Sequence, residues 1–168
     1  MKQRVIKLSL TNPSTNNKAV DDLLDYIEWI EWKSQELAAE LAAEGWDYAV
    51  KVFETAFYKG PKDFKRLDIE ERGEGKYAIV AEGETYILLE FGAGITYYGE
   101  GHPQAEEFGF GPGTYPGQTH ALTGKGWYLP KAKGGEHTYG NPPNRAMYDA
   151  AKEMRGNLLR IARKVFNS

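Results

Sequence analysis

Residues 17–41 have the sequence NKAVDDLLDYIEWIEWKSQELAAEL, in which apolar side chains recur every three or four positions. This spacing is that of one face of an α-helix. Asn17 is a favourable N-cap residue, and Asp21 and Asp22 place negative charge near the positive end of the helix dipole. Gly45 is placed to end the helix in a left-handed cap. We therefore expect a helix of about 27 residues, about 40 Å long.

This helix carries two sets of large apolar side chains. The main stripe consists of Val20, Leu23, Leu24, Ile27, Ile30, Leu37, Ala38 and Leu41. A second set, Tyr26, Trp29 and Trp32, lies on a face rotated from that stripe. Either the two sets form one wide buried stripe, or the aromatic flank contacts a neighbouring subunit, because Trp and Tyr are enriched in interface cores.

Short strands are expected on both sides of the helix. Apolar and polar residues alternate over 4–10 and again over 46–52, which is the period of a strand. Residues 66–71, 76–81 and 86–91 follow, separated by turns that contain glycine. The pattern predicts an antiparallel meander. Its last strand is apolar on both faces and is expected to be covered on both sides.

A second helix is expected near the end of the chain, from about Asn144 to Val165, after the stop signal Asn141-Pro142-Pro143. Its apolar stripe is Met147, Ala150, Ala151, Met154, Leu158, Ile161 and Val165, with Lys152, Arg155, Arg160 and Arg163 outside. Two helices with a meander predict an α+β fold, the helices packed on one face of the sheet. Residues 1–168 are expected to form one domain.

Residues 92–144 form a long segment with little periodicity. It holds 13 of the 19 glycines, six of the eight prolines and all three histidines. Its aromatic residues include Tyr97, Tyr98, Phe108, Phe110, Tyr115, Trp127, Tyr128 and Tyr139. A loop of this length in a small domain is usually functional or disordered, and the aromatic content argues against disorder. We consider an arm that becomes ordered against a partner, or a loop packed on its own sheet.

Composition excludes several classes of protein. The net charge of −3 would not draw the chain onto nucleic acid or an anionic membrane. The absence of Cys excludes a disulfide scaffold and a thiolate site. The apolar runs are too short to span a bilayer, and the N-terminus has no signal-peptide pattern. We expect a soluble protein without a membrane partner.

No catalytic or metal-binding motif emerges. His102, His120 and His137, even with Glu106 and Glu107, lack the spacing of a ligand motif, and we expect solvent-exposed loop histidines. The glycines at 92–94 and 124–126 lack the rest of a phosphate-binding loop. None of the four serines lies in a nucleophile elbow. We expect no bound metal and no cofactor.

Three stretches are informative as an ordered set. They are LLEFGAG at 88–94, GKGWY at 124–128 and HTYGNPPNRAMY at 137–148. This order behind a long helix resembles the tail-component family of long-tailed bacteriophages, the minor tail-completion or neck proteins, in the form found in phages and prophages of Gram-positive bacteria. The resemblance covers nearly the whole chain as a single tail-component domain. One departure is Arg145-Ala146-Met147, where many members have a Pro-Phe-Met-like step.

The resemblance implies a non-enzymatic virion protein at the head–tail junction, made in the cytoplasm of the host bacterium. It implies a homo-oligomeric ring that contacts other neck, connector and tail proteins, with only non-specific proximity to translocating DNA. The candidate interface residues are Tyr26, Trp29, Trp32, Tyr97, Tyr98, Phe108, Phe110, Trp127 and Tyr128.

Two other functions stay open. The first is a carbohydrate-binding module or cell-wall hydrolase, in which Tyr97, Tyr98, Trp127 and Tyr128 stack on sugars and Glu90 or Glu106 serves as the acid. The second is a histidine-based metal protein.

Overall fold

The computed structural model describes residues 6–7, 11, 13–56, 58, 63–93, 101–110, 125–128, 131 and 135–168. The elements in order are α1 (Pro13–Thr55), β1 (Arg66–Glu71), β2 (Tyr77–Glu82), α2 (Glu84–Phe91), β3 (Trp127–Tyr128), β4 (His137–Thr138) and α3 (Ala146–Asn167). Tyr97, Tyr98, His120 and most of the strand expected over residues 4–10 lie outside the described residues. Ile6 and Lys7 from that segment are described, and they are not in a strand.

Helix α1 is 43 residues long, so the prediction that it ends at Gly45 and gives way to a strand over 46–52 is wrong. The alternation that suggested a strand is short, and the same stretch also places Trp46, Ala49 and Phe53 at helical spacing. Ala49 and Phe53 are buried, and the Trp46 indole donates a hydrogen bond to the Leu67 carbonyl at 3.1 Å. Packing of this helical face outweighs the local strand pattern.

Gly45 lies inside α1 and serves close packing. A Cβ at this position would lie 2.6 Å from Met154 Sδ and 2.9 Å from Ile79 Cδ1. The missing side chain therefore lets α1, α3 and β2 approach one another at this point.

Strands β1 and β2 form an antiparallel hairpin, as predicted, in register from Arg66↔Glu82 to Glu71↔Tyr77. The third strand expected over 86–91 is wrong, because this segment belongs to helix α2. Its apolar run has no clear period, and short runs of this kind do not distinguish a strand from a buried helix. Asp63 tethers the start of α2: its carboxylate accepts the Glu84 N–H at 3.2 Å, and its own N–H donates to Thr85 Oγ1 at 2.7 Å.

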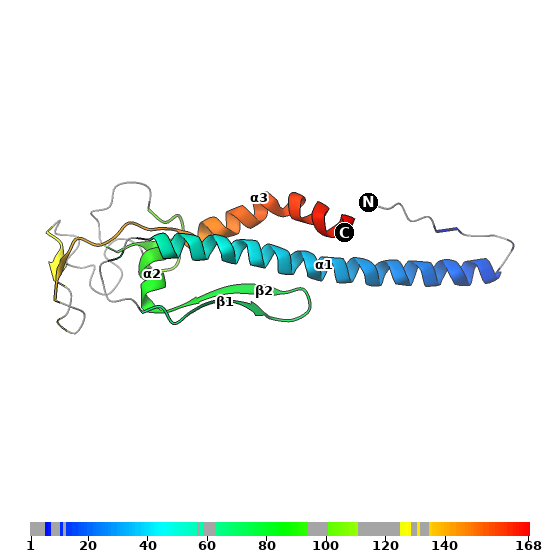
Figure 1. Ribbon diagram of the computed structural model, residues 1–168, viewed down its shortest axis with the longest axis horizontal. Helices are drawn as coiled ribbons and strands as arrows, with labels where there is room; N and C mark the ends of the chain where they lie inside the picture. Colours follow the sequence, from blue (N-terminus) through cyan, green and yellow to red (C-terminus); the bar gives the residue numbers. More distant parts are fainter. Residues whose placement is uncertain are drawn as a thin grey trace.

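The elements are arranged around α1. Figure 1 shows α3 along one side of the second half of α1 and the β1–β2 hairpin along the other. The predicted α+β class, with helices packed against the sheet, is confirmed, although the described sheet beside α1 is a two-stranded hairpin. The first half of α1 extends past both α3 and the hairpin (Figure 1).

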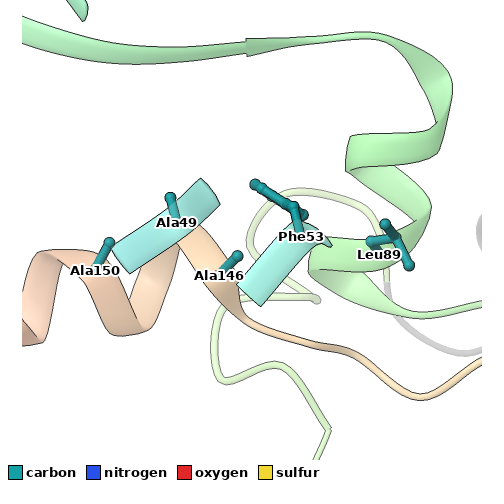
Figure 2. Packing of buried hydrophobic residues seen from close by; sticks show 5 residues of the cluster. All are labelled: Ala49, Phe53, Leu89, Ala146 and Ala150. Atoms are coloured by element: carbon teal, nitrogen blue, oxygen red, sulfur yellow. The ribbon is translucent and has the colours of Figure 1, made fainter. Parts of the chain in front are cut away.

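The core lies where α1, α2 and α3 meet. Its fully or nearly buried side chains are Ala49, Phe53, Leu89, Ala146 and Ala150 (Figure 2). Three of these five are alanines, which allow helix backbones to approach closely. Beyond the core, β3 pairs with β4 as a two-residue ladder, and Ala93 forms an isolated antiparallel bridge with Asn141.

Candidate functional site

The side chain of Glu90, a residue of α2, lies at the N-terminus of α3. Its Oε2 accepts the Met147 N–H at 2.8 Å, and its Oε1 accepts the Tyr148 N–H at 2.9 Å. The first N–H groups of a helix have no partner within the helix, and a negative charge there is favourable. Arg145, the N-cap residue, provides no capping side chain. Glu90, only 6% exposed, therefore caps α3 from another element.

His102 completes this buried cluster. Its Nδ1 accepts the Gln104 N–H at 3.1 Å, which assigns the ring proton to Nε2 and lets that atom donate to Glu90 Oε1 at 3.1 Å. The ring lies between Phe91, at a centroid distance of 4.4 Å, and Tyr148, at 5.4 Å. The expectation that the loop histidines are exposed is wrong for His102, because a carboxylate partner and two aromatic rings compensate its burial.

His137 is exposed, as expected, and its Nε2 lies 2.9 Å from the Lys125 carbonyl oxygen. In the part of the chain that the structure describes, no three His, Asp or Glu side chains are grouped as metal ligands.

The backbone around Glu90 is tied to the segment before α3. Asn144 donates its N–H to the Leu89 carbonyl at 2.7 Å, and Ala93 and Asn141 exchange two backbone hydrogen bonds of 3.0 and 2.8 Å. Gly92, the residue before Ala93, has a φ of 77°, and a Cβ at this position would lie 2.8 Å from Pro143 N. Residues 88–93 and 137–148 thus form one hydrogen-bonded unit, which we call the Glu90 junction.

A groove of about 610 Å³ opens beside this junction, between β2, α2, residues 101–108 and α3. Ile87, 37% exposed, and Phe108, 55% exposed, contribute apolar surface to it. Arg72, Lys152 and Arg155 supply positive charge. Arg72 is already paired with Glu70 at 2.9 Å, and Lys152 lies 5.7 Å from the Tyr148 ring centroid.

A second unusual surface lies on the first half of α1. Val20, Leu23, Leu24, Ile27 and Ile30 are 36–54% exposed, although the sequence pattern assigns them to the core stripe. Helix α3 ends beside residues 29–33, where Phe166 contacts the Trp29 ring and Lys33 donates to Ser168 Oγ at 2.7 Å. The turn of the hairpin, at Gly75, reaches α1 at Gln35. The stripe continues past the elements that cover its second half.

The predicted interface aromatics of α1 differ in exposure. Trp32 is 58% exposed, whereas Trp29 is half-buried between Tyr26 and Phe166, with both ring centroids at 5.7 Å. Tyr26 and Trp29 are therefore more covered than the aliphatic row at 20–30, whereas Trp32 is not.

The loop aromatics form two groups. Phe108 and Phe110 lie against Phe91, with ring centroids at 5.9 and 4.5 Å. Trp127 and Tyr128 belong to β3, at the end of the molecule away from the first half of α1 (Figure 1), and neither lines the groove. Tyr128 is 73% exposed.

Two groups on the hairpin and in α2 have shifted pKa values. Hydrogen bonds from Arg72 and then Arg66 lower the pKa of Glu70 on the hairpin. Burial raises the pKa of Tyr86, whose ring packs against Phe53 and Phe64 at 4.7 Å.

Comparison of the sequence with protein-family models and with curated proteins, and of the structure with solved structures, found no match. None of the helices in the described ranges has the length and apolar character needed to cross a membrane.

Proposed function

We propose that this protein is a non-enzymatic structural component of a long-tailed bacteriophage virion, a neck or tail-completion protein that assembles as a ring at the head–tail junction. The observation that carries the proposal is the ordered set of three motifs at 88–94, 124–128 and 137–148. Two of them are joined at the Glu90 junction, so the residues behind the resemblance act together in building the fold.

The chemistry of Glu90 supports a structural role. Both carboxylate oxygens accept backbone N–H groups of α3, and one also accepts from His102. A sugar-cleaving acid must be protonated before it can donate a proton to its substrate, and protonation of Glu90 would remove the negative charge that caps α3. Glu90 is therefore better suited to holding α2 and α3 together than to serving as the acid of a hydrolase.

The surface of α1 supports assembly. Apolar side chains of one row are exposed over three helical turns, and isolated exposed apolar residues are normal whereas contiguous ones indicate an interaction site. A ring subunit needs such surfaces for its neighbours.

The test is made in the phage or lysogen whose genome carries this sequence. Its gene is replaced by a null allele, and particles are purified and imaged by electron microscopy. We expect DNA-filled heads and separate tails, with intact virions restored by a plasmid copy, and an epitope-tagged copy retained in the purified virions. Infectious virions formed without the protein, or a tagged copy absent from them, would contradict the proposal.

A binding assay addresses the carbohydrate alternative. Wild type and Trp127→Ala are compared for retention on insoluble bacterial cell wall and on a panel of soluble glycans. We expect no retention of either protein. Retention of wild type that Trp127→Ala abolishes would favour the carbohydrate-binding function instead.

A further inference from the structure

The exposed first half of α1 is acidic as well as apolar. We call residues 16–32 the α1 projection; it carries the exposed side chains Val20, Leu23, Leu24, Ile27 and Ile30. Its acidic residues are Asp21, Asp22, Asp25, Glu28 and Glu31, all exposed, and none forms an ion pair with another residue of the described ranges. Lys18 is the one basic residue of this segment. The projection is thus an apolar helix row beside unpaired negative charge.

The outer face of α3 has the opposite character. Lys152 and Arg155 lie at the rim of the groove, and helical spacing continues their row with Leu159, 70% exposed, and Arg163. Arg155 and Arg163 form no ion pair within the described part of the chain. By contrast, Arg160 and Lys164 of the same helix are paired with Glu44 and Glu40 of α1. We call the groove together with this row the α3 groove.

The two surfaces cannot meet within one chain. Both are fixed to α1: the projection is its first half, whereas Phe53 near its end lines the groove. Leu24 and Phe53 are separated by 29 helical positions, or about 44 Å along the axis. A straight helix cannot fold back over that distance.

We infer that the α1 projection of one copy docks in the α3 groove of a second copy of this chain. The row at 20, 23, 24 and 27 has the i, i+3, i+4, i+7 spacing by which amphipathic helices occupy apolar grooves. Its carboxylates would face Lys152, Arg155 and Arg163, while its apolar side chains cover Ile87, Phe108 and Leu159. Complementary charge on one chain selects a second copy as the occupant.

This contact joins different surfaces of the two copies, so a bound pair still has one projection and one groove free. Such head-to-tail contacts continue until they close into a ring or form a filament. The inference rests on the proposed function only for the choice of a closed ring, because the contact itself follows from the two surfaces.

The decisive test uses two variants that each remove one surface. Val20→Asp/Leu24→Asp alters the projection, and Arg155→Glu/Leu159→Asp alters the α3 groove; all four side chains are exposed, so both variants should fold. Light scattering coupled to size exclusion measures mass across concentration. Each variant alone should be monomeric, whereas their mixture should form a 1:1 dimer from the two intact surfaces. The wild type should form larger species.

Charge reversal separates a direct contact from an indirect effect. Glu28→Lys and Arg155→Glu should each raise the dissociation constant about tenfold or more, and the double variant should recover much of the loss. Lys51→Glu is the matched control, because it reverses an exposed charge on α1 outside both surfaces. It should assemble like the wild type.

Three results would overturn the inference: a wild type that stays monomeric at millimolar concentration, surface variants that assemble like the wild type, or a mixture that stays monomeric. Assembly that survives both surface variants would leave the proposed virion function standing with a different interface. Conversely, head-to-tail dimers from a protein absent from virions would retain the inference and remove that function.

Discussion

At the residue scale, Glu90 connects distant parts of the chain. It joins α2 to a helix that begins 56 positions later, and its charge replaces the side-chain cap that Arg145 does not provide. Replacing it leaves two part-buried N–H groups and the buried His102 ring proton without this acceptor. Leaving buried donors unpaired costs more free energy than the hydrogen bond contributes when it is formed.

We therefore predict that Glu90→Ala lowers the free energy of unfolding by about 2–4 kcal/mol, measured by urea denaturation. Glu90→Gln should lose less, because its amide oxygen still accepts one N–H. Glu106→Ala, an exposed carboxylate in the neighbouring loop, is the control and should change stability by less than about 0.5 kcal/mol. A Glu90→Ala protein as stable as the control would contradict the capping role.

Two glycines provide a matched pair for backbone conformation. Gly92 has φ 77°, and its absent Cβ would meet backbone atoms of the segment before α3. Gly156 lies in α3 with open space around it. We predict that Gly92→Ala destabilises by about 2 kcal/mol or more, from left-handed strain plus the clash. Gly156→Ala should stabilise by about 0.5–1 kcal/mol through helix propensity. If both variants changed the melting temperature equally and in the same direction, the different roles of Gly92 and Gly156 would be contradicted.

At the element scale, the sequence predicted the elements whose local pattern agrees with their packing. The hairpin strands alternate between turns rich in glycine, and α3 has a proline stop signal before a regular apolar stripe. The pattern failed where packing decides. Gly45 resembled a helix cap but allows α1 to pack closely against α3 and β2, and the apolar run at 86–91 belongs to helix α2. Short apolar runs fit both periods, so tertiary contacts choose between them.

The candidate site was only partly predictable for the same reason. Glu90 and the 137–148 stretch were singled out as pieces of motifs, but their meeting depends on a loop that returns the chain to α2. No spacing in the sequence links His102 to a carboxylate 12 residues earlier. The groove is likewise formed by segments that are far apart in the sequence. The exposure of the apolar row on α1 could not be predicted, because it depends on where α3 and the hairpin end along α1.

The β1–β2 hairpin carries a prediction about pH. Arg72 and Arg66 hold the pKa of Glu70 below the ordinary value of 4.5. A carboxyl whose folded pKa is lowered stabilises the fold above its unfolded pKa, and this contribution disappears as the pH falls through the folded pKa. We predict that Glu70→Gln is less stable than wild type at pH 7 and that the difference narrows below pH 4.5.

Glu71→Gln is the control for the hairpin, because Glu71 is exposed and forms no ion pair within the described residues. Thermal unfolding of the three proteins between pH 3 and pH 7 provides the measurement. A Glu70→Gln protein that differs from wild type by the same amount at every pH would show that the lowered pKa does not contribute to stability.

At the scale of the whole molecule, α1 separates folding from assembly along its own length. Its second half packs against α3, the hairpin and α2, and supplies Ala49 and Phe53 to the core (Figure 2). Its first half exposes a row of aliphatic side chains beyond those elements (Figure 1). Mutations in the two halves should therefore affect different properties of the protein.

We predict that Val20→Asp/Leu24→Asp changes the melting temperature of the dilute monomer by less than about 2 °C, because surface substitutions away from buried groups cost little. The same variant should fail to restore head–tail joining in the null phage. Leu89→Ala, in the core, should lower the free energy of unfolding by about 2–5 kcal/mol. Below its melting temperature it should still assemble, since it leaves the α1 projection unchanged. A projection variant that melts as early as Leu89→Ala would place residues 20–24 in the folding core and remove the basis for treating them as a docking surface.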